Sequence, residues 1–183
     1  MWNPDGQTNH QDWNLECANS IQHWQARTII NEMKMQQLKI LGISEMRWTG
    51  SGTFVSEDTT VIYSGGEKHE RGLGLLFDET TEKTIINWEP VSDRIITARL
   101  KTRFTDITII QVYTPTETAW DAEKDKFYEQ LNEVISGAPS HDMKIVMGDF
   151  NAKIGEDNEG YEEVRGRQAL GEINDKKAML SQR

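Results

Sequence analysis

A series of short, β-branched runs separated by turn residues constrains the fold of this chain more than any other feature. Between residues 59 and 115 the sequence contains "TTVIYSGG", "GLGLLFDE", "KTIINW", "DRIITARLKT" and "TDITIIQVYTP". Runs that alternate or stay apolar, and that are rich in Val, Ile and Thr, are typical of strands in a packed sheet. They predict a largely antiparallel β-structure over this region.

Two helices are predicted, one on each side of these strands. In residues 22–38, "QHWQARTIINEMKMQQL", apolar residues recur near helical spacing and no Gly or Pro interrupts them. In residues 121–136, "DAEKDKFYEQLNEVIS", the apolar residues share one helical face, and Gly137 and Pro139 end the pattern. Short apolar strands, "KILGISE" and "MKIVMGD", follow the two helices. This order of elements predicts an α+β layered fold in which helices cover sheets.

Length and composition favour one globular domain. The 183 residues are 36% apolar and 27% charged, which suits a single core. No apolar run approaches the roughly 18 residues of a membrane span, and "MWNPDGQTNHQDWN" lacks the features of a secretory signal. Because the single cysteine, Cys17, cannot form an internal disulfide, an intracellular location is expected, in the nucleus or the cytoplasm.

The charge of the chain bears on its partners. A net charge of −10 argues against a polyanion, because nucleic-acid affinity depends on Lys and Arg that neutralise phosphates. The charge is uneven, however, since the segment from Glu117 to Glu163 holds 13 acidic and 4 basic residues. Such a segment is either a solvated face or a source of carboxylates for a cation, and the solvated face is favoured for most of it.

Three predicted strands end in polar residues that suit phosphate or metal chemistry. "ILGISE" ends at Glu45, "IIQVY" ends at Tyr113, and "IVMGDFN" carries Asp149 and Asn151. Side chains at strand ends can be held rigidly at the rim of a sheet, where preorganised sites are often built. If these three strand ends converge, they form a site.

Phosphodiester hydrolysis requires groups of these types. It needs a hard cation, a group that orients or deprotonates water, and donors around the phosphate. Mg²⁺ often uses only one or two protein carboxylates, so Glu45 alone could anchor it, and Mn²⁺ suits the same oxygen ligands. Asp149 could orient the attacking water, while the Asn151 amide and the Tyr113 phenol could donate to phosphate oxygens.

Each residue also has a simpler interpretation. A lone glutamate such as Glu45 is usually solvated, and Tyr113 could be a tyrosine with a buried ring and a wet hydroxyl. The "GDFN" sequence could be an Asx-turn. His69, in "GGEKHERGLG", is favoured as a surface residue because a metal site needs several partners at matched spacing. Arg94 is favoured as a structural arginine that packs its stem and pairs its head.

Five motifs taken in order resemble a known superfamily. They are "ILGISEMRWTGSG", "GGEKHERGLGLL", "SDRIITARLKT", "IIQVYTPT" and "GDFNAKIG". From Ile29 to Leu180 the chain is similar to the endonuclease/exonuclease/phosphatase superfamily. More narrowly, it resembles the apurinic-type endonuclease domain of RTE-class non-LTR retrotransposons and the related craniofacial development protein 2-like proteins. The resemblance implies a four-layer α/β/β/α sandwich with a divalent-metal phosphodiesterase site at one end.

The same resemblance implies roles for residues of this chain. Glu45 matches the metal-binding glutamate of the family, and Tyr113 matches the active-site tyrosine near the scissile phosphate. Asp149 matches the aspartate that orients or activates the nucleophile, and Asn151 matches its partner. Asn174, in "GEINDKKAML", resembles an asparagine near the substrate groove.

Both ends of the chain depart from the family pattern. Asn14, in "DWNLECAN", is a candidate for the metal-binding asparagine, but its spacing to Glu45 is a few residues longer than expected. Residues 1–25 are therefore interpreted as a divergent segment, and 26–183 as a partial domain with an incomplete second half. The histidine motif of the family is missing, since all four histidines precede Asp149. The absence of the last strands predicts an unpaired sheet edge, which invites association.

Three functions remain open. The first is a retrotransposon-derived, Mg²⁺-dependent endonuclease domain that nicks DNA, truncated and either weakly active or inactive, because losing one member of a catalytic set is costly. The second is a non-catalytic remnant that acts, if at all, as a protein-interaction module, which the missing histidine and the acidic charge favour. The third is a phosphatase that acts on small phosphoesters. It ranks last because "RWTG" and "AKIG" resemble the retrotransposon branch.

Overall fold

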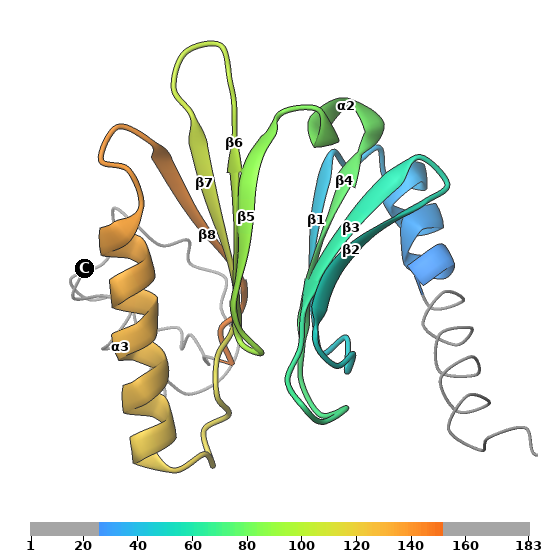
Figure 1. Cartoon of the computed structure of the whole chain (residues 1–183). Helices are drawn as coiled ribbons and strands as arrows, with labels where there is room; N and C mark the ends of the chain where they lie inside the picture. Colours follow the sequence, from blue (N-terminus) through green and yellow to red (C-terminus); the bar gives the residue numbers. More distant parts are fainter. Residues whose placement is uncertain (1–25, 152–183) are drawn as a thin grey trace, which may run out of the picture.

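Two four-stranded β-sheets face each other in the computed structural model of this protein, which describes residues 26–151 (Figure 1). The first sheet has the order β1-β4-β3-β2, and the second has the order β5-β6-β7-β8. The strands of the first sheet are β1 (Ile40–Ser44), β2 (Ser51–Ser56), β3 (Thr59–Ser64) and β4 (Leu73–Asp78). Those of the second are β5 (Ile85–Ser92), β6 (Ile95–Leu100), β7 (Ile107–Tyr113) and β8 (Met143–Asp149). Neighbouring strands are antiparallel except for β7 and β8, which are parallel.

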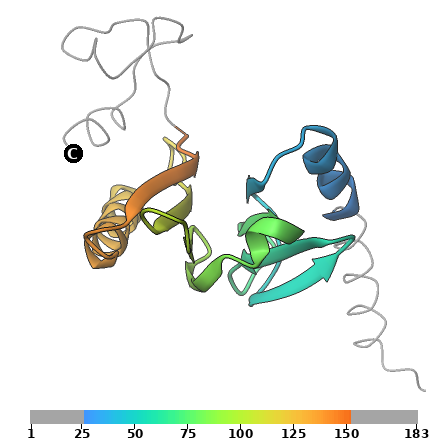
Figure 2. The ribbon, with the colours of Figure 1, turned by 90° about the horizontal axis from the view of Figure 1, so that it is seen from above.

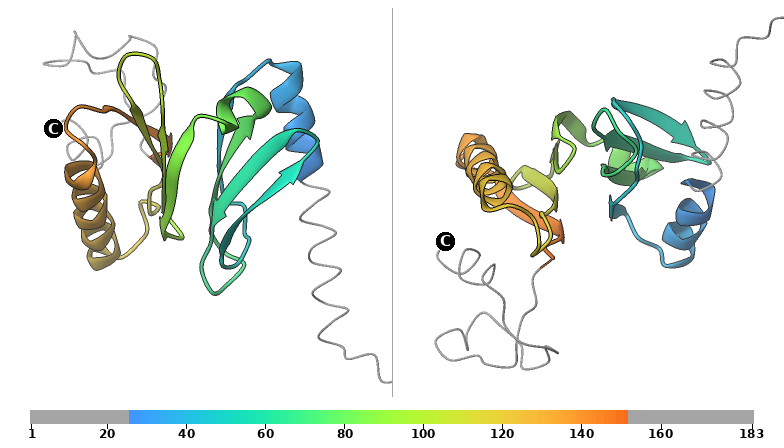
Figure 3. Two further views of the ribbon diagram at one scale, coloured as in Figure 1. Left: turned by 45° about the horizontal axis from the view of Figure 1, so that its top comes forward. Right: turned by 90° about the horizontal axis from the view of Figure 1, so that it is seen from below.

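A helix covers the outer face of each sheet, as Figure 2 and Figure 3 show. The helix at 26–35 packs on the first sheet through Ile30 and Met33. On the second sheet, α3 (Asp121–Gly137) packs through a buried face that includes Phe127. The layers therefore run helix, sheet, sheet, helix, which confirms the predicted α+β four-layer class. Within residues 26–151, no helix is long and apolar enough to cross a membrane.

An apolar layer fills the space between the two sheets. It includes buried residues of both sheets: Ile62, Leu75, Phe77, Ile96, Ala98 and Ile109. Residues 73–77 of β4 are buried on both faces of the strand, because β4 lies inside its sheet and beneath the helix at 26–35. A strand in this position needs a nearly continuous apolar run, which "LGLLFD" supplies.

The structure confirms the predicted strands and both predicted helices, and it adds two short elements. The first is β2, which joins β3 through a two-residue turn at Glu57 and Asp58, both with positive φ. Such turns usually carry Asn-Gly or Asp-Gly, and Glu-Asp does not predict a hairpin at this position. The second is α2 (Glu79–Glu82), whose first turn is capped by the Asp78 side chain, which accepts a hydrogen bond from the Thr81 N–H.

The connection through α3 places two strand ends side by side. Because α3 links β7 to β8, the two strands run parallel and finish at the same end of the second sheet. Tyr113 and Asp149, the last residues of these strands, are register partners. At Gly148, φ is +138° and a Cβ atom would lie 1.9 Å from the Val112 carbonyl oxygen, so the two strands approach closely here.

Two sheet edges lie next to each other in the described part of the chain. β1 forms an edge of the first sheet and β8 forms an edge of the second, and the two strands are in contact. On β8, Met143 and Ile145 are exposed apolar residues. Association through this edge stays a prediction.

An ion pair links Asp142, the residue just before β8, to Arg99 of β6. Arg99 donates from Nε and Nη2 to the two carboxylate oxygens of Asp142, over 2.7 and 3.0 Å, and the Thr108 hydroxyl donates to the same carboxylate over 2.7 Å. The Asp142 side chain is only 3% exposed. The hydrogen bonds from Arg99 hold the pKa of Asp142 below its ordinary value. This pair therefore favours the folded state as long as Asp142 is ionised.

The Asp142→Asn variant is expected to lower the free energy of unfolding at neutral pH. A carboxyl group whose pKa is depressed by folding adds stability above its unfolded pKa, about 3.9, and this stability is lost as the pH falls through the folded pKa. The difference between variant and wild type should therefore shrink below about pH 4. Urea denaturation at neutral and at acid pH measures it, and a difference independent of pH would contradict the ion-pair explanation.

The Gly148→Ala variant is expected to destabilise the fold by about 1–3 kcal/mol, because a side chain at this φ is strained and would clash with Val112. The matched control is Gly137→Ala at the end of α3, where a Cβ atom meets nothing within 4 Å. That variant should be neutral or slightly stabilising. Urea denaturation of both proteins makes the comparison, and equal stabilities would refute it.

Candidate active site

The structure brings the polar ends of β1, β7 and β8 together at one end of the sandwich. Tyr113 ends β7 beside Asp149, its register partner on β8, and Asn151 follows two residues later. Glu45 follows directly after β1 in the first sheet. The four residues that were predicted from the sequence to form a site therefore lie close together at this end, and they come from both sheets.

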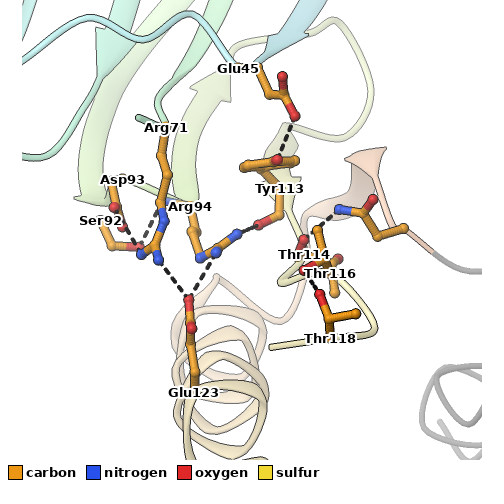
Figure 4. A network of polar contacts seen from close by, with 11 residues as sticks. Glu45, Arg71, Ser92, Asp93, Arg94, Tyr113, Thr114, Thr116, Thr118 and Glu123 are labelled. Carbon is orange, nitrogen blue, oxygen red and sulfur yellow. Dashed lines mark hydrogen bonds and ion pairs between the residues drawn. The ribbon is translucent and has the colours of Figure 1, made fainter. Parts of the chain in front are cut away.

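A hydrogen bond joins the two sheets at this point. The Tyr113 hydroxyl donates to Oε1 of Glu45 over 2.5 Å (Figure 4). The tyrosine residue is 8% exposed, while the Glu45 side chain is 48% exposed. The bond to the carboxylate, together with burial, raises the pKa of Tyr113. The phenol is therefore a stable donor at neutral pH, and its hydroxyl bonds to protein rather than pointing to solvent.

The loop that carries Glu45 has an unusual backbone. Glu45 and Arg47 have φ values of 59° and 57°, in the left-handed region that side chains other than glycine rarely adopt. The loop is fastened to residues 65–72 by backbone hydrogen bonds, among them Met46 N–H to the Gly72 carbonyl over 3.1 Å. The Arg47 carbonyl also accepts from Nδ1 of His69 over 2.8 Å. His69 is thus an exposed residue, as predicted, but one that braces the Glu45 loop.

Asp149 and Asn151 form the predicted Asx-turn. Oδ1 of Asp149 accepts from the backbone N–H of Asn151 over 2.8 Å, and Asn151 has a φ of 46°. The Asn151 amide nitrogen donates to the Thr114 carbonyl over 2.7 Å, and the Thr114 N–H donates to the Asp149 carbonyl over 2.9 Å. The turn fixes the exposed Asp149 carboxylate next to Tyr113, so the Asx-turn is compatible with a site role, which stays a prediction.

Arg94 holds Tyr113 from the other side. Its Nη1 donates to the Tyr113 carbonyl over 3.0 Å, and its guanidinium carbon lies 5.1 Å from the centroid of the tyrosine ring. Arg94 lies in the turn between β5 and β6, and its side chain is 11% exposed. The structural interpretation of Arg94, with a packed stem and a paired head, is confirmed.

Sequence reasoning missed the carboxylate that pairs with Arg94. Oε1 of Glu123, on α3, accepts from Arg94 over 2.9 Å and also contacts Arg71 over 2.9 Å (Figure 4). Glu123 belongs to the acidic segment that was interpreted as a solvated face. Its partners lie 29 and 52 positions earlier in the chain, so no local pattern identifies the contact.

The metal-binding prediction rests on Glu45. Within residues 26–151, no group of three or more His, Cys, Asp or Glu could enclose a metal ion. The half-exposed carboxylate of Glu45 nevertheless suits Mg²⁺, which keeps several waters and often takes one protein carboxylate. Asn14 and Asn174, the other proposed metal and substrate residues, lie outside the described residues, as does the proposed boundary at residue 25.

Comparison with known proteins adds sequence relatives and a structural neighbour. No family model matches the chain. It is 33% identical over 164 residues to craniofacial development protein 2 of Bos taurus, and 32% identical over 164 residues to the protein of the same name from Tragulus javanicus. These alignments cover 89% of this chain but 27% and 28% of the relatives, so the chain spans about a quarter of their length.

Among solved structures, the endonuclease domain of TRAS1, a telomere-specific non-LTR retrotransposon, matches with a TM-score of 0.49. The match has 19% sequence identity and covers 68% of this chain and 52% of that domain. The resemblance to craniofacial development protein 2-like proteins found in the sequence is confirmed by these sequence relatives. Over the 164 aligned residues, the chain is a homologue of craniofacial development protein 2.

Proposed function

We propose that this chain is a phosphodiesterase domain that hydrolyses the DNA backbone with Mg²⁺ or Mn²⁺. The observation that carries the proposal is the convergence of Glu45, Tyr113 and Asp149 from three separate strands. The hydrogen bond from Tyr113 to Glu45 fixes a donor and a carboxylate within one small volume between the sheets. Residues placed in this way can act together on one phosphate group.

Each residue has a part that its surroundings support. The Tyr113 hydroxyl, which donates to Glu45 in this structure, would turn to donate to a phosphate oxygen once Glu45 holds the cation. The exposed carboxylate of Asp149, fixed by the turn to Asn151, is placed to accept a proton from an attacking water or to orient that water. Asn151 braces the turn through Thr114 and so keeps Asp149 in position.

Glu45 is the residue that would hold the cation. The bound ion would neutralise charge that develops on the phosphate. One oxygen of Glu45 accepts from Tyr113, and the other lies 3.7 Å from Nη2 of Arg47. Arg47 is exposed and brings positive charge to a site on an acidic chain, which favours the approach of a phosphate.

The Glu45→Ala and Asp149→Ala variants test this function. With Mg²⁺ or Mn²⁺, the full chain should convert supercoiled plasmid into the nicked form, and EDTA should stop the reaction. Each variant should lose at least about a hundredfold in rate, because each removes a group that acts in the transition state. Gel electrophoresis of time courses measures the rates.

The control for these variants is Glu129→Ala, which removes an exposed carboxylate of α3 that lies outside the site. It should nick at the wild-type rate. Equal traces of nicking in wild type, both variants and the EDTA sample would show a contaminating nuclease and would refute the proposal.

A non-catalytic role is the second candidate, and one observation favours it. Within the described residues, the Glu45 carboxylate accepts the hydrogen bond from Tyr113, but no group of three possible metal ligands includes Glu45. In this case the domain keeps the arrangement of these side chains without catalysing a reaction, and it acts by binding other proteins. Folded wild-type protein that shows no metal-dependent nicking would support this alternative over the first.

A further inference from the structure

Another polar contact links the two halves of the sandwich near the Tyr113–Glu45 hydrogen bond. Arg71, in the loop after β3, contacts Oε1 of Glu123 through Nη2 over 2.9 Å, and Asp93 of the β5–β6 turn through Nη1 over 3.4 Å. Glu123 lies in the first turn of α3, which covers the second sheet. This contact therefore ties a loop of the first sheet to both the turn and the helix of the second (Figure 4).

Arg94 connects this contact to Tyr113. One end of its guanidinium group donates to Glu123 over 2.9 Å, and the other end donates to the Tyr113 carbonyl over 3.0 Å. The backbone joins the same two residues, since the Tyr113 N–H donates to the Arg94 carbonyl over 3.0 Å. Arg94 thus holds Tyr113 by its N–H, by its carbonyl and by the face of its ring.

The loop containing Arg71 also contacts the Glu45 loop. Gly72, the next residue, accepts the N–H of Met46, and His69 contacts the Arg47 carbonyl. The contacts therefore close a ring. It passes from Glu45 to Tyr113, through Arg94, Glu123 and Arg71, and returns through the loop to Glu45.

Charge makes Glu123 the critical member of this ring. Two guanidinium groups approach one carboxylate oxygen, and the side chain of Arg94 is only 11% exposed. A guanidinium group that is largely removed from water needs an anionic partner to hold it in place. Without Glu123, the two arginines would repel each other, and Arg94 would lose the contact that fixes its orientation toward Tyr113.

We propose that Glu123 and Arg94 are positioning residues for Tyr113, which set the place of its hydroxyl relative to Glu45 without touching the substrate. For catalysis, this inference rests on the proposed phosphodiesterase function. The placement of Tyr113 itself does not depend on that function, so the two can be tested separately.

The Glu123→Gln variant of the full chain is the first test, with Glu129→Gln on the same helix as its matched control. Tyrosine rings labelled with ¹³C are followed by NMR, and the Tyr113 signal is assigned from its loss in Tyr113→Phe. Loss of Glu123 should shift the ring signal of Tyr113, because the cation over its face moves. The Glu129→Gln variant should leave that signal in place.

Nicking kinetics supply a second measurement. In Glu123→Gln, kcat should fall about tenfold to a hundredfold while KM changes by less than about twofold, because the misplaced hydroxyl matters in the transition state. The Arg94→Lys variant keeps the charge but loses the planar fork that spans Glu123 and Tyr113, so it should show the same changes to a smaller extent. It also serves if Glu123→Gln fails to fold.

The outcomes separate the two proposals. A Tyr113 signal that is unchanged in both folded variants would overturn the positioning role, whatever the nicking rates. A shifted signal with a lowered kcat supports it. If the wild type does not nick DNA, the phosphodiesterase function is refuted. The NMR signal of the Tyr113 side chain then decides by itself whether Glu123 and Arg94 position Tyr113.

Discussion

The apolar layer between the two sheets is the constraint on which the rest of the structure depends. Side chains such as Leu75 and Phe77 from the first sheet meet Ile96 and Ile109 from the second, and all four are buried. Close packing of this layer fixes the distance between the sheets. Only because that distance is fixed can Glu45 of one sheet and Tyr113 of the other form a hydrogen bond of 2.5 Å.

Local strain accompanies the polar end of the sandwich. Glu45 and Arg47 adopt left-handed backbone conformations, which cost about 1–3 kcal/mol each for residues other than glycine. The surrounding contacts hold them there, through backbone hydrogen bonds to residues 65–72 and the network around Glu123. The strained loop positions Glu45, and the network around Glu123 positions Tyr113. Both therefore act on the hydrogen-bonded pair of Glu45 and Tyr113, which is the arrangement expected of a preorganised site.

Much of the fold could be predicted from local patterns. Runs such as "LGLLFD" and "ITIIQVY" have the composition of buried strands, and α3 shows its periodicity directly. Prediction missed β2, because its turn at Glu57 and Asp58 adopts positive φ without the residues that usually signal it. Local sequence patterns also did not predict the parallel pairing of β7 with β8, because strand order depends on contacts between segments that are distant in the chain.

The sequence by itself determined which residues could form the site and at which strand ends they lie. Glu45, Tyr113, Asp149 and Asn151 were identifiable because each lies at or just after the end of an apolar run that forms a strand. Only the tertiary structure decided that these ends meet, and that Arg71, Arg94 and Glu123 hold them from behind. The physical reason is distance along the chain: the ion pairs join residues 29 and 52 positions apart. They meet only because α3 packs on the second sheet and the two sheets pack on each other.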